Sequence, residues 1–408
     1  MNMKREIIIG IILGIFILSL ITIFLLSSDP AFRYYFGTST GLKDKPVLID
    51  KNFVIKEVIV GIQSSTALTF IENDILFLEK ESGKIRHIKD GILVDKPVWD
   101  FQVKQEGCNC FTESGLLGIT SIDSDVYVYV TEELNLDESN VENRIYKFTW
   151  RDNKLQNPLL LNILPAKGIL HHGGSLVADL DGNVFASVGD HGFKTSIQNY
   201  DNDIIADAGI ILRVGYDQDF KSPSVSLNPL DHYYAIGIRN SFGLAVDPKT
   251  GYLWDTENGP EVYDEINLIY PKFNSGWAKI LGPSSDTISL NYTPDFSYSD
   301  PEFSWEFTVA PTGISFVDEK WDKYQHSVFV GDCKGGDLYR FELNDSRDGF
   351  IFENPDLQDL VLNELDNDEE IIFGKNFGCI TDVKYSYDGY LYVISYLNNG
   401  AIFKIYPK

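Results

Sequence analysis

The sequence predicts an all-β protein: a six-bladed β-propeller preceded by one N-terminal transmembrane helix. Three observations lead to this prediction. There is an apolar run near the N-terminus, a short β-type pattern recurs about six times along the rest of the chain, and helical periodicity never persists there. We divide the 408 residues into an anchor at 1–28, a tether at 29–51 and the propeller at 52–408.

The N-terminal segment has the length and composition of a membrane anchor. A run free of charged residues extends from Ile7 to Leu26, and a helix needs about 20 such residues to cross a bilayer. Lys4 and Arg5 precede the run and an acidic domain follows it. The positive-inside rule therefore predicts a single-pass protein of the cell membrane, with a cytoplasmic N-terminus and the propeller outside. A cleaved signal peptide is the alternative, although the run is long for a signal and lacks a clear small-residue cleavage site.

The remainder of the chain alternates short β-branched or aromatic runs with Gly, Asn or Asp turns. Clear copies are "NDILFLEKESGKIRHI", "DLDGNVFASVGD", "DPKTGYLWDTENG" and "SYDGYLYVISYLNNGAIFKIYP". Radial repetition of such four-stranded units is how a propeller avoids exposed sheet edges. The net charge of −26 excludes nucleic acid as a partner, because a phosphate backbone is held by Lys and Arg.

Functional residues of a propeller are expected on the loops at one end of its central funnel. Three of the six histidines lie between residues 171 and 191, in "HHGGSL" and "GDHG". Further polar loops are "CNCFTESGLLG", "GIRNSFG", "TENGPEVYDEINLI", "TVAPTG" and "DCKGG".

These loops, in this order, resemble the quinoprotein glucose/sorbosone dehydrogenases, a family that includes soluble glucose and aldose sugar dehydrogenases using pyrroloquinoline quinone. The resemblance is carried by "ESGLLGI", "HHGGSL", "GIRNSFGLAVDP", "GYLWDTENGP", "DEINLI", "NSGW", "APTGISF" and "TDVKYSYDGYLYVIS". It covers most of the chain from about Thr112 to the C-terminus. It implies a six-bladed propeller with a funnel that faces a sugar, and an external electron acceptor.

The resemblance also assigns the chemistry. His171 matches the family's general base, and Arg239 matches the arginine that stabilises charge growing on the quinone. Gly259 and Pro260 match the dipeptide whose carbonyls hold calcium. Asp264 and Glu265 match an acidic pair that supplies a carboxylate to an additional calcium site in some members.

Five further residues match positions that contact the cofactor: Glu113, His191, Asn240, Thr308 and Lys334. Glu113 and His191 stand where the family has glutamines. Cys379 and Thr381 replace a pair of arginines that would pair with the quinone's carboxylates. Lys375 lies close in sequence and could compensate in part.

The cysteines allow three interpretations, one of which is that they are unrelated buried or free thiols. A disulfide between Cys333 and Cys379 suits an oxidising compartment. A thiolate or thiolate-histidine metal site that includes His171 or His191 is the alternative, since sulfur and imidazole suit zinc or copper. Cys108 and Cys110 are expected on the same face of the propeller.

Two hypotheses for the function follow. In the first, the protein is a membrane-anchored dehydrogenase that oxidises the C1 hydroxyl of an aldose to a lactone, with pyrroloquinoline quinone and Ca²⁺. In the second, the propeller has lost the cofactor and binds a ligand, a metal or another protein. The retained His171, Arg239 and Gly259 favour the first, and Glu113 and Cys379 favour the second.

Overall fold

The computed structural model describes residues 45–62, 64–103, 112–134, 141–215, 229–284, 295–396 and 400–408. The chain divides into two units, Met1–Asp44 and Lys45–Lys408. The predicted anchor, most of the tether, and Cys108 and Cys110 lie outside the described residues. Within those residues, none of the helices has the length and apolar composition needed to cross a bilayer.

The described strands form six sheets, taken here in the chain order of their innermost strands. The first sheet contains β3 (Ser65–Ile71), β4 (Asp74–Glu79), β5 (Lys84–Lys89), β6 (Ile92–Leu93) and β7 (Trp99–Asp100). The second contains β8 (Leu116–Ile122), β9 (Asp125–Glu133), β10 (Val141–Arg151) and β11 (Lys154–Leu164). The third contains β12 (Leu176–Ala178), β13 (Val184–Val188), β14 (Ile210–Arg213), β15 (Tyr233–Ile236), β19 (Phe273–Asn274) and β20 (Ser297–Tyr298).

Of the other three sheets, the fifth and the sixth also take a strand from the beginning of the described chain. The fourth contains β16 (Ser241–Val246), β17 (Leu253–Glu257), β18 (Val262–Ile269), β21 (Phe303–Phe307) and β26 (Val361–Leu362). The fifth contains β22 (Pro311–Phe316), β23 (Ser327–Asp332), β24 (Leu338–Leu343), β25 (Phe350–Ile351), β27 (Ile372–Lys375) and β1 (Val47–Leu48). The sixth contains β28 (Ile380–Tyr385), β29 (Leu391–Ser395), β30 (Ala401–Pro407) and β2 (Phe53–Val60). Among the described residues the helices are short 3₁₀ turns: Ser196–Gln198, Pro229–His232, Glu319–Tyr324 and Pro355–Leu357.

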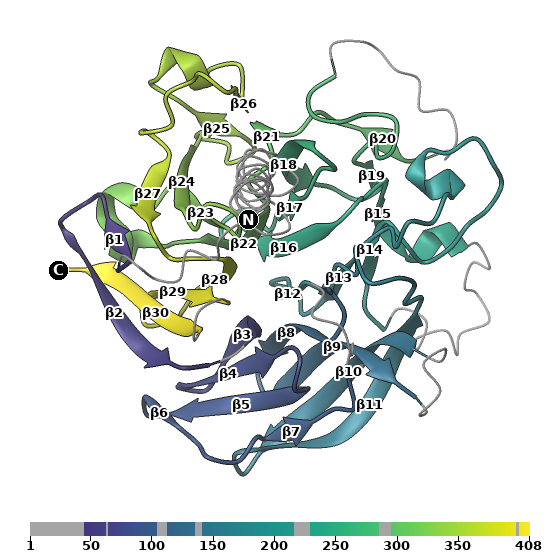
Figure 1. Cartoon of the computed structure of the whole chain (residues 1–408), viewed down its shortest axis with the longest axis vertical. Coiled ribbons are helices and arrows are strands. Elements are labelled where there is room, and N and C mark those ends of the chain that lie inside the picture. Colours follow the sequence, from purple (N-terminus) through teal and green to yellow (C-terminus); the bar gives the residue numbers. More distant parts are fainter. Residues whose placement is uncertain are drawn as a thin grey trace, which may run out of the picture. The chain divides into compact units, whose positions relative to one another are not determined.

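The sheets are arranged around a central axis (Figure 1). Their innermost strands contact one another in a closed ring, in the order β3, β8, β12, β16, β22, β28 and back to β3. This is a β-propeller, so the predicted all-β propeller is confirmed. In this ring the first sheet lies opposite the fourth.

The ring is closed by strands that are distant in sequence. In the sixth sheet, β2 pairs with β30 antiparallel, with Phe53 opposite Pro407 and Val60 opposite Ala401. In the fifth, β1 pairs with β27. The outer edge of each of these sheets is therefore supplied by the beginning of the propeller, and the backbone hydrogen bonds hold the ring shut.

Burial explains why these segments are strands. The central strands β13 ("VFASV") and β29 ("LYVIS") are buried at every position because neighbouring sheets cover both of their faces. Between the fourth and fifth sheets the core is largely aromatic, with Trp254, Trp305 and Phe341 in one cluster. Such rings bury large apolar areas and pack edge-to-face, as Trp305 does on Phe341.

An ion pair and a disulfide connect neighbouring sheets. Arg347, after β24, makes a bidentate ion pair with Asp247, after β16, with Nε–Oδ2 and Nη2–Oδ1 distances of 2.6 and 2.9 Å. Both side chains are buried. Cys333, after β23, forms a disulfide with Cys379, directly before β28, as one of the interpretations of the cysteines predicted. Among the described residues, no cluster of three or more His, Cys, Asp or Glu side chains could hold a metal.

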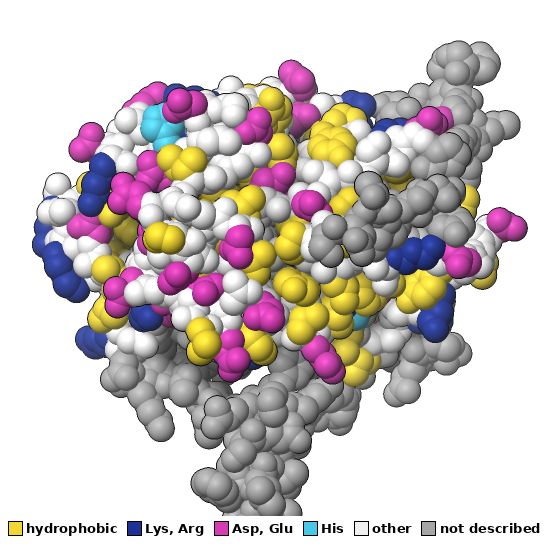
Figure 2. Space-filling view, turned by 90° about the horizontal axis from the view of Figure 1, so that it is seen from above, with side chains coloured by type: hydrophobic (Ala, Val, Ile, Leu, Met, Phe, Trp, Pro, Cys, Tyr) yellow, Lys and Arg dark blue, Asp and Glu magenta, His cyan; other side chains and the backbone are white. Residues whose placement is uncertain are grey.

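The surface carries the acidic character of the sequence. Acidic side chains are spread over the face seen in Figure 2, among hydrophobic and fewer basic ones. On the described part of that face the basic side chains do not gather into a continuous patch.

We predict that the Cys333–Cys379 disulfide stabilises the propeller. Replacing both cysteines by serine should lower the free energy of unfolding by about 2–4 kcal/mol, because the unfolded chain regains the entropy of a long loop. Urea denaturation of the two proteins measures the difference. An unchanged denaturation midpoint, at equal dependence on urea, would contradict the prediction.

Candidate active site

The residues of the site lie at one end of the propeller. This is the end at which the innermost strand of each sheet begins and the second strand ends, since these two strands are antiparallel neighbours. Glu113, His171 and Arg239 come just before β8, β12 and β16, and Asp190 and Gly259 come just after β13 and β17. Loops of different sheets therefore meet around one funnel.

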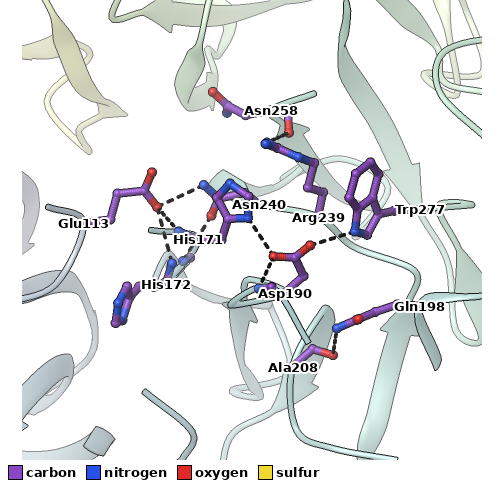
Figure 3. A network of polar contacts seen from close by, with 12 residues as sticks. Glu113, His171, His172, Asp190, Gln198, Ala208, Arg239, Asn240, Asn258 and Trp277 are labelled. Atoms are coloured by element: carbon purple, nitrogen blue, oxygen red, sulfur yellow. Dashed lines mark hydrogen bonds and ion pairs between the residues drawn. The ribbon is translucent and has the colours of Figure 1, made fainter. Parts of the chain in front are cut away.

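His171 forms a dyad with Asp190. Its Nδ1 lies 2.6 Å from Asp190 Oδ1, while Asp190 also accepts hydrogen bonds from Trp277 Nε1 at 2.8 Å and Gly192 N at 2.9 Å. In Figure 3 the Asp190 carboxylate lies between His171 and the Trp277 indole. Burial by itself raises the pKa of Asp190, but these hydrogen bonds and the nearby His171 outweigh it and the pKa lies below its usual value. An ionised Asp190 fixes the proton on Nδ1, so His171 Nε2 carries the lone pair that can accept a proton.

Glu113 belongs to a network of hydrogen bonds that joins loops of three sheets (Figure 3). Its Oε2 accepts hydrogen bonds from the backbone N–H groups of His171, at 2.6 Å, and His172, at 3.3 Å. The same oxygen accepts from Asn240 Nδ2 at 3.0 Å. Asn240 Oδ1 in turn accepts from Gly173 N at 3.2 Å. The carboxylate that replaces the family's glutamine therefore holds the His171 loop and Asn240 in place.

Arg239 is positioned by contacts on both sides. Its Nη1 donates to Asn258 O at 2.7 Å, and the guanidinium carbon lies 5.4 Å from the centroid of the Trp277 ring. Its backbone N–H donates to Glu257 Oε1 at 2.6 Å. Trp277 therefore links the two residues of the predicted catalytic pair. It contacts Arg239 directly, and it contacts His171 indirectly, through the hydrogen bond to Asp190.

The Gly259–Pro260 turn is held by Asp264. Asp264 Oδ1 accepts from Gly259 N at 2.8 Å, and Oδ2 accepts from Val309 N and Ala310 N at 2.6 and 2.7 Å. A Cβ on Gly259 would lie 2.2 Å from Tyr263 O, so this turn requires glycine. Asp264 therefore holds two loops in place by accepting hydrogen bonds from their backbone N–H groups. Burial raises its pKa to about 6, although the three N–H donors oppose that rise.

A small hollow lies beside Arg239. Its lining consists of Arg239, Glu257, Gly259, Tyr263, Glu265, Ser275, Trp277, Ile280 and Leu281. Burial raises the pKa of Glu257 to about 7, and burial together with the charge of Glu257 raises that of Glu265 well above its usual value. Two buried carboxylates on one pocket suit a divalent cation, whose remaining ligands would be backbone carbonyls or ligand oxygens.

His172 and His191 form a buried pair beneath the dyad, with ring centroids 4.6 Å apart. Asn143 bridges them: Oδ1 lies 3.3 Å from His172 Nδ1, and Nδ2 lies 3.4 Å from His191 Nε2. Because Nδ2 also donates to Pro165 O, the amide orientation is fixed, and His191 Nε2 acts as an acceptor. Burial lowers the pKa of His191 to about 4. His191 therefore supports the histidine loop, and its predicted contact with the cofactor stays a prediction.

The remaining predicted residues lie together around the disulfide. Exposed Lys334 donates from Nζ to Thr308 O at 2.8 Å. Cys379 belongs to the disulfide, and Thr381 Oγ1 donates to Ser65 O at 2.9 Å. The start of β28 therefore presents an uncharged pair to the funnel. Lys375, the suggested substitute, ends β27 in the fifth sheet and lies near Asp337.

Three residues of the site escaped the sequence analysis: Asp190, Trp277 and Asn143. Asp190 lies in the quoted "GDHG", and a carboxylate beside clustered histidines is a signal that could have found it. Trp277 follows "NSG" in a quoted motif. Asn143 lies in the middle of a strand, and only the fold brings it to the histidines.

A histidine base oriented by an aspartate, beside an arginine on the inner loops of a β-propeller, defines a class of site suited to removing a proton next to growing negative charge. The chain belongs to the glucose/sorbosone dehydrogenase family, whose profile matches residues 62–404. This confirms the resemblance found in the sequence.

Two of the proteins that are similar in sequence are named as sugar dehydrogenases. The chain is 26% identical over 254 residues to the aldose sugar dehydrogenase YliI of Escherichia coli, covering 58% of this chain and 60% of that protein. It is 27% identical over 299 residues to quinoprotein glucose dehydrogenase B of Acinetobacter calcoaceticus, covering 66% and 62%. In both cases the alignment spans less than two thirds of the relative.

Solved structures share the fold. The aldose sugar dehydrogenase of Streptomyces coelicolor in its PQQ-bound form has a TM-score of 0.64 at 21% identity, covering 87% of this chain and 98% of that one. The apo-form of the soluble Escherichia coli enzyme has a TM-score of 0.66 at 21% identity, covering 87% and 100%.

We predict a pH-dependent stability contribution from Asp332, which ends β23 and shapes the Lys334 loop. Its carboxylate accepts from Gly335 N, Gly336 N and Tyr339 Oη at 2.7, 2.6 and 3.0 Å. Burial, with repulsion from Asp337, raises its pKa to about 7. The native state therefore binds this proton more tightly than the unfolded state, so the contribution is full below about pH 4 and is lost as the pH rises through 7.

Urea denaturation between pH 5 and pH 8 tests this prediction. Asp332 should lower the free energy of unfolding of the wild type by on the order of 1.4 kcal/mol for each pH unit up to about pH 7, and should add no further loss above it. Asp332→Asn, which cannot ionise, should lose less. Equal losses in the two proteins would show that Asp332 does not titrate in this range.

Proposed function

We propose that the protein is an aldose dehydrogenase that oxidises the C1 hydroxyl of a sugar to a lactone, using pyrroloquinoline quinone and Ca²⁺ bound at the funnel. The observation that carries the proposal is the His171–Asp190 dyad with Arg239 beside it, joined through Trp277. Membership of a dehydrogenase family and the names of the relatives support it.

The charge of part of the site suits the quinone. Arg239 and Lys334 offer positive charge to a ligand that bears three carboxylates, and Gly259 and Trp277 lie beside Arg239. Calcium would be held by the carbonyls of Gly259 and Pro260 and, at the additional site, by Glu265. Asp264 would be the weaker ligand of the two, because its oxygens accept three backbone N–H groups, whereas those of Glu265 accept one, from Gly282. When bound, the quinone supplies the two-electron acceptor for hydride and calcium supplies a Lewis acid beside it.

The chain's own residues move the proton. His171 Nε2 takes the proton of the C1 hydroxyl while the C1–H bond breaks with loss of hydride, so that the C1 carbonyl of the lactone forms. Asp190 keeps the imidazole in the required tautomer and stabilises it once it is protonated. Arg239, fixed by Asn258 and Trp277, places a permanent positive charge where negative charge grows on the acceptor.

A second function is favoured by one feature of the same site. The Glu113 carboxylate takes the Asn240 amide donor, and Cys379 and Thr381 bring no positive charge. A funnel of this kind also suits a propeller that binds a ligand or a protein without the quinone.

We further propose that Ile7–Leu26 anchors the protein in the cell membrane with the propeller outside. The length of the run and the preceding Lys4 and Arg5 support this location. A disulfide within the propeller agrees with an oxidising compartment.

We predict calcium-dependent binding of pyrroloquinoline quinone. Titration of the purified protein, by calorimetry and by the absorbance of the quinone, should give a Kd of about 1 μM or tighter with Ca²⁺, which corresponds to about 8 kcal/mol. Chelation of Ca²⁺ should weaken binding, and an aldose should then bleach the bound quinone. Failure to bind at any Ca²⁺ concentration would contradict this function and favour the ligand-binding propeller.

We predict that His171→Ala abolishes turnover without loss of the cofactor. Removal of a general base lowers kcat by about 10²- to 10⁴-fold, whereas Kd for the quinone should stay near the wild-type value. His326→Ala is the matched control, because His326 is exposed and precedes β23 at the other end of the propeller. If His171→Ala lost turnover and binding in equal measure, the residue would have a structural role.

A further inference from the structure

Trp277 lies between the two members of the predicted catalytic pair, and the proposed chemistry gives it no role. Its indole Nε1–H donates to Asp190 Oδ2 at 2.8 Å, and the centroid of its ring lies 5.4 Å from the guanidinium carbon of Arg239. Figure 3 shows the indole beside both side chains. One rigid side chain therefore contacts both the carboxylate that orients the base and the cation of the site.

The two oxygens of Asp190 have different partners. Oδ1 accepts from His171 Nδ1 at 2.6 Å and from Gly192 N at 2.9 Å, whereas Oδ2 accepts from the indole. The χ2 torsion of an aspartate is broad, so hydrogen bonds to one oxygen leave the plane of the carboxylate loosely defined. The indole bond to the second oxygen fixes that plane, and with it the direction of the hydrogen bond to the imidazole.

The face of the same indole limits the position of Arg239. The guanidinium donates from Nη1 to Asn258 O at 2.7 Å and lies over the indole ring. A cation is attracted by the negative face of an aromatic ring, and the attraction grows as water is removed. Arg239 and Trp277 both line the small hollow of the site. The indole therefore sets where the positive charge stands relative to the base.

The backbone of Trp277 is itself fixed by three residues of the third sheet and its loops. Its N–H donates to Gly237 O at 3.1 Å, and its carbonyl accepts from Asn199 Nδ2 at 2.7 Å. Asn199 and Asn274, both buried, exchange two amide hydrogen bonds of 3.0 and 2.9 Å. A side chain that positions others needs such a rigid support.

We propose that Trp277 is a positioning residue for both members of the catalytic pair. Its N–H keeps the Asp190 carboxylate in the plane that orients His171. Its ring keeps Arg239 at a fixed place beside the base. The two contacts belong to different parts of the indole, so a substitution can remove one and keep the other. The inference rests on the proposed function, because it assigns a residue to the same reaction.

The tautomer of His171 tests the first contact without any cofactor. Nitrogen NMR of the protein with isotope-labelled histidine should show the neutral imidazole of wild-type His171 with its proton on Nδ1. In Trp277→Phe the share of the form protonated on Nε2 should rise, because a loosened carboxylate holds the Nδ1–H group less firmly. The same tautomer population in the two proteins would overturn the inference.

Two substitutions separate the two contacts in the holoenzyme. Trp277→Phe keeps an aromatic face and lacks the N–H, so kcat should fall about 10- to 100-fold while Kd for the quinone stays within about twofold of wild type. Trp277→Leu also removes the ring, so Kd should in addition weaken about 3- to 30-fold as Arg239 loses its support. A merely structural role would change kcat and Kd together in both variants, and that result would contradict the proposal.

Trp99→Phe is the matched control. Trp99 is a half-buried tryptophan of the first sheet that packs on Phe101 and Phe148, so its substitution should leave kcat and Kd unchanged. If Trp277→Phe does not fold, replacement of Trp277 by benzothienylalanine takes its place, because sulfur then substitutes for the indole N–H and both rings remain. The same changes in the tautomer and in kcat are expected.

The outcomes separate the two claims. Wild-type kcat in Trp277→Phe would overturn the role of Trp277 and leave the proposed function standing. A wild-type protein that binds no quinone would overturn the proposed function, and the tautomer measurement would still decide whether the indole orients the dyad.

Discussion

The structure depends on one constraint: six sheets close into a ring in which the innermost strands all begin at the same end. Hydrogen bonds between β2 and β30 hold that closure. Because the ring is closed, loops distant in sequence meet at the funnel, and Glu113 can contact both His171 and Asn240. The site therefore belongs to no single sheet.

Carboxylates fix the loops of this face by hydrogen bonding. Four of them accept at least one backbone N–H group of a loop: Glu113, Asp190, Asp264 and Asp332. Backbone N–H groups stabilise the ionised form of such a carboxylate, and burial opposes them: the pKa of Asp190 lies below its usual value, whereas those of Asp264 and Asp332 are raised. Hydrogen bonds to these carboxylates hold the loops of this face in place, and Arg239 lies among them as a permanent positive charge.

The sequence was sufficient for the propeller fold and for several of the residues that the fold brings together, because both leave local signals. Alternating β-type runs predicted the propeller, and the motifs around His171, Arg239 and Gly259 predicted residues that the fold brings to one end. Other features depend on contacts between distant segments. Only the fold brings Asn143 to the histidines, buries His191 and turns Asp264 towards Val309 and Ala310. The sequence left more than one interpretation of Cys333 and Cys379, and the structure shows that they form a disulfide.

The pairing of β2 with β30 also has a consequence for the synthesis of the chain. Ribosomes complete β2 long before they reach Ala401, so β2 must remain without its partner until almost all of the propeller has been made. A chain that stops before β30 exposes the edges of β2 and β29. Such unpaired edges attract strands of other molecules. Truncated products of this protein are therefore expected to aggregate, and only the complete propeller can be released as a closed ring.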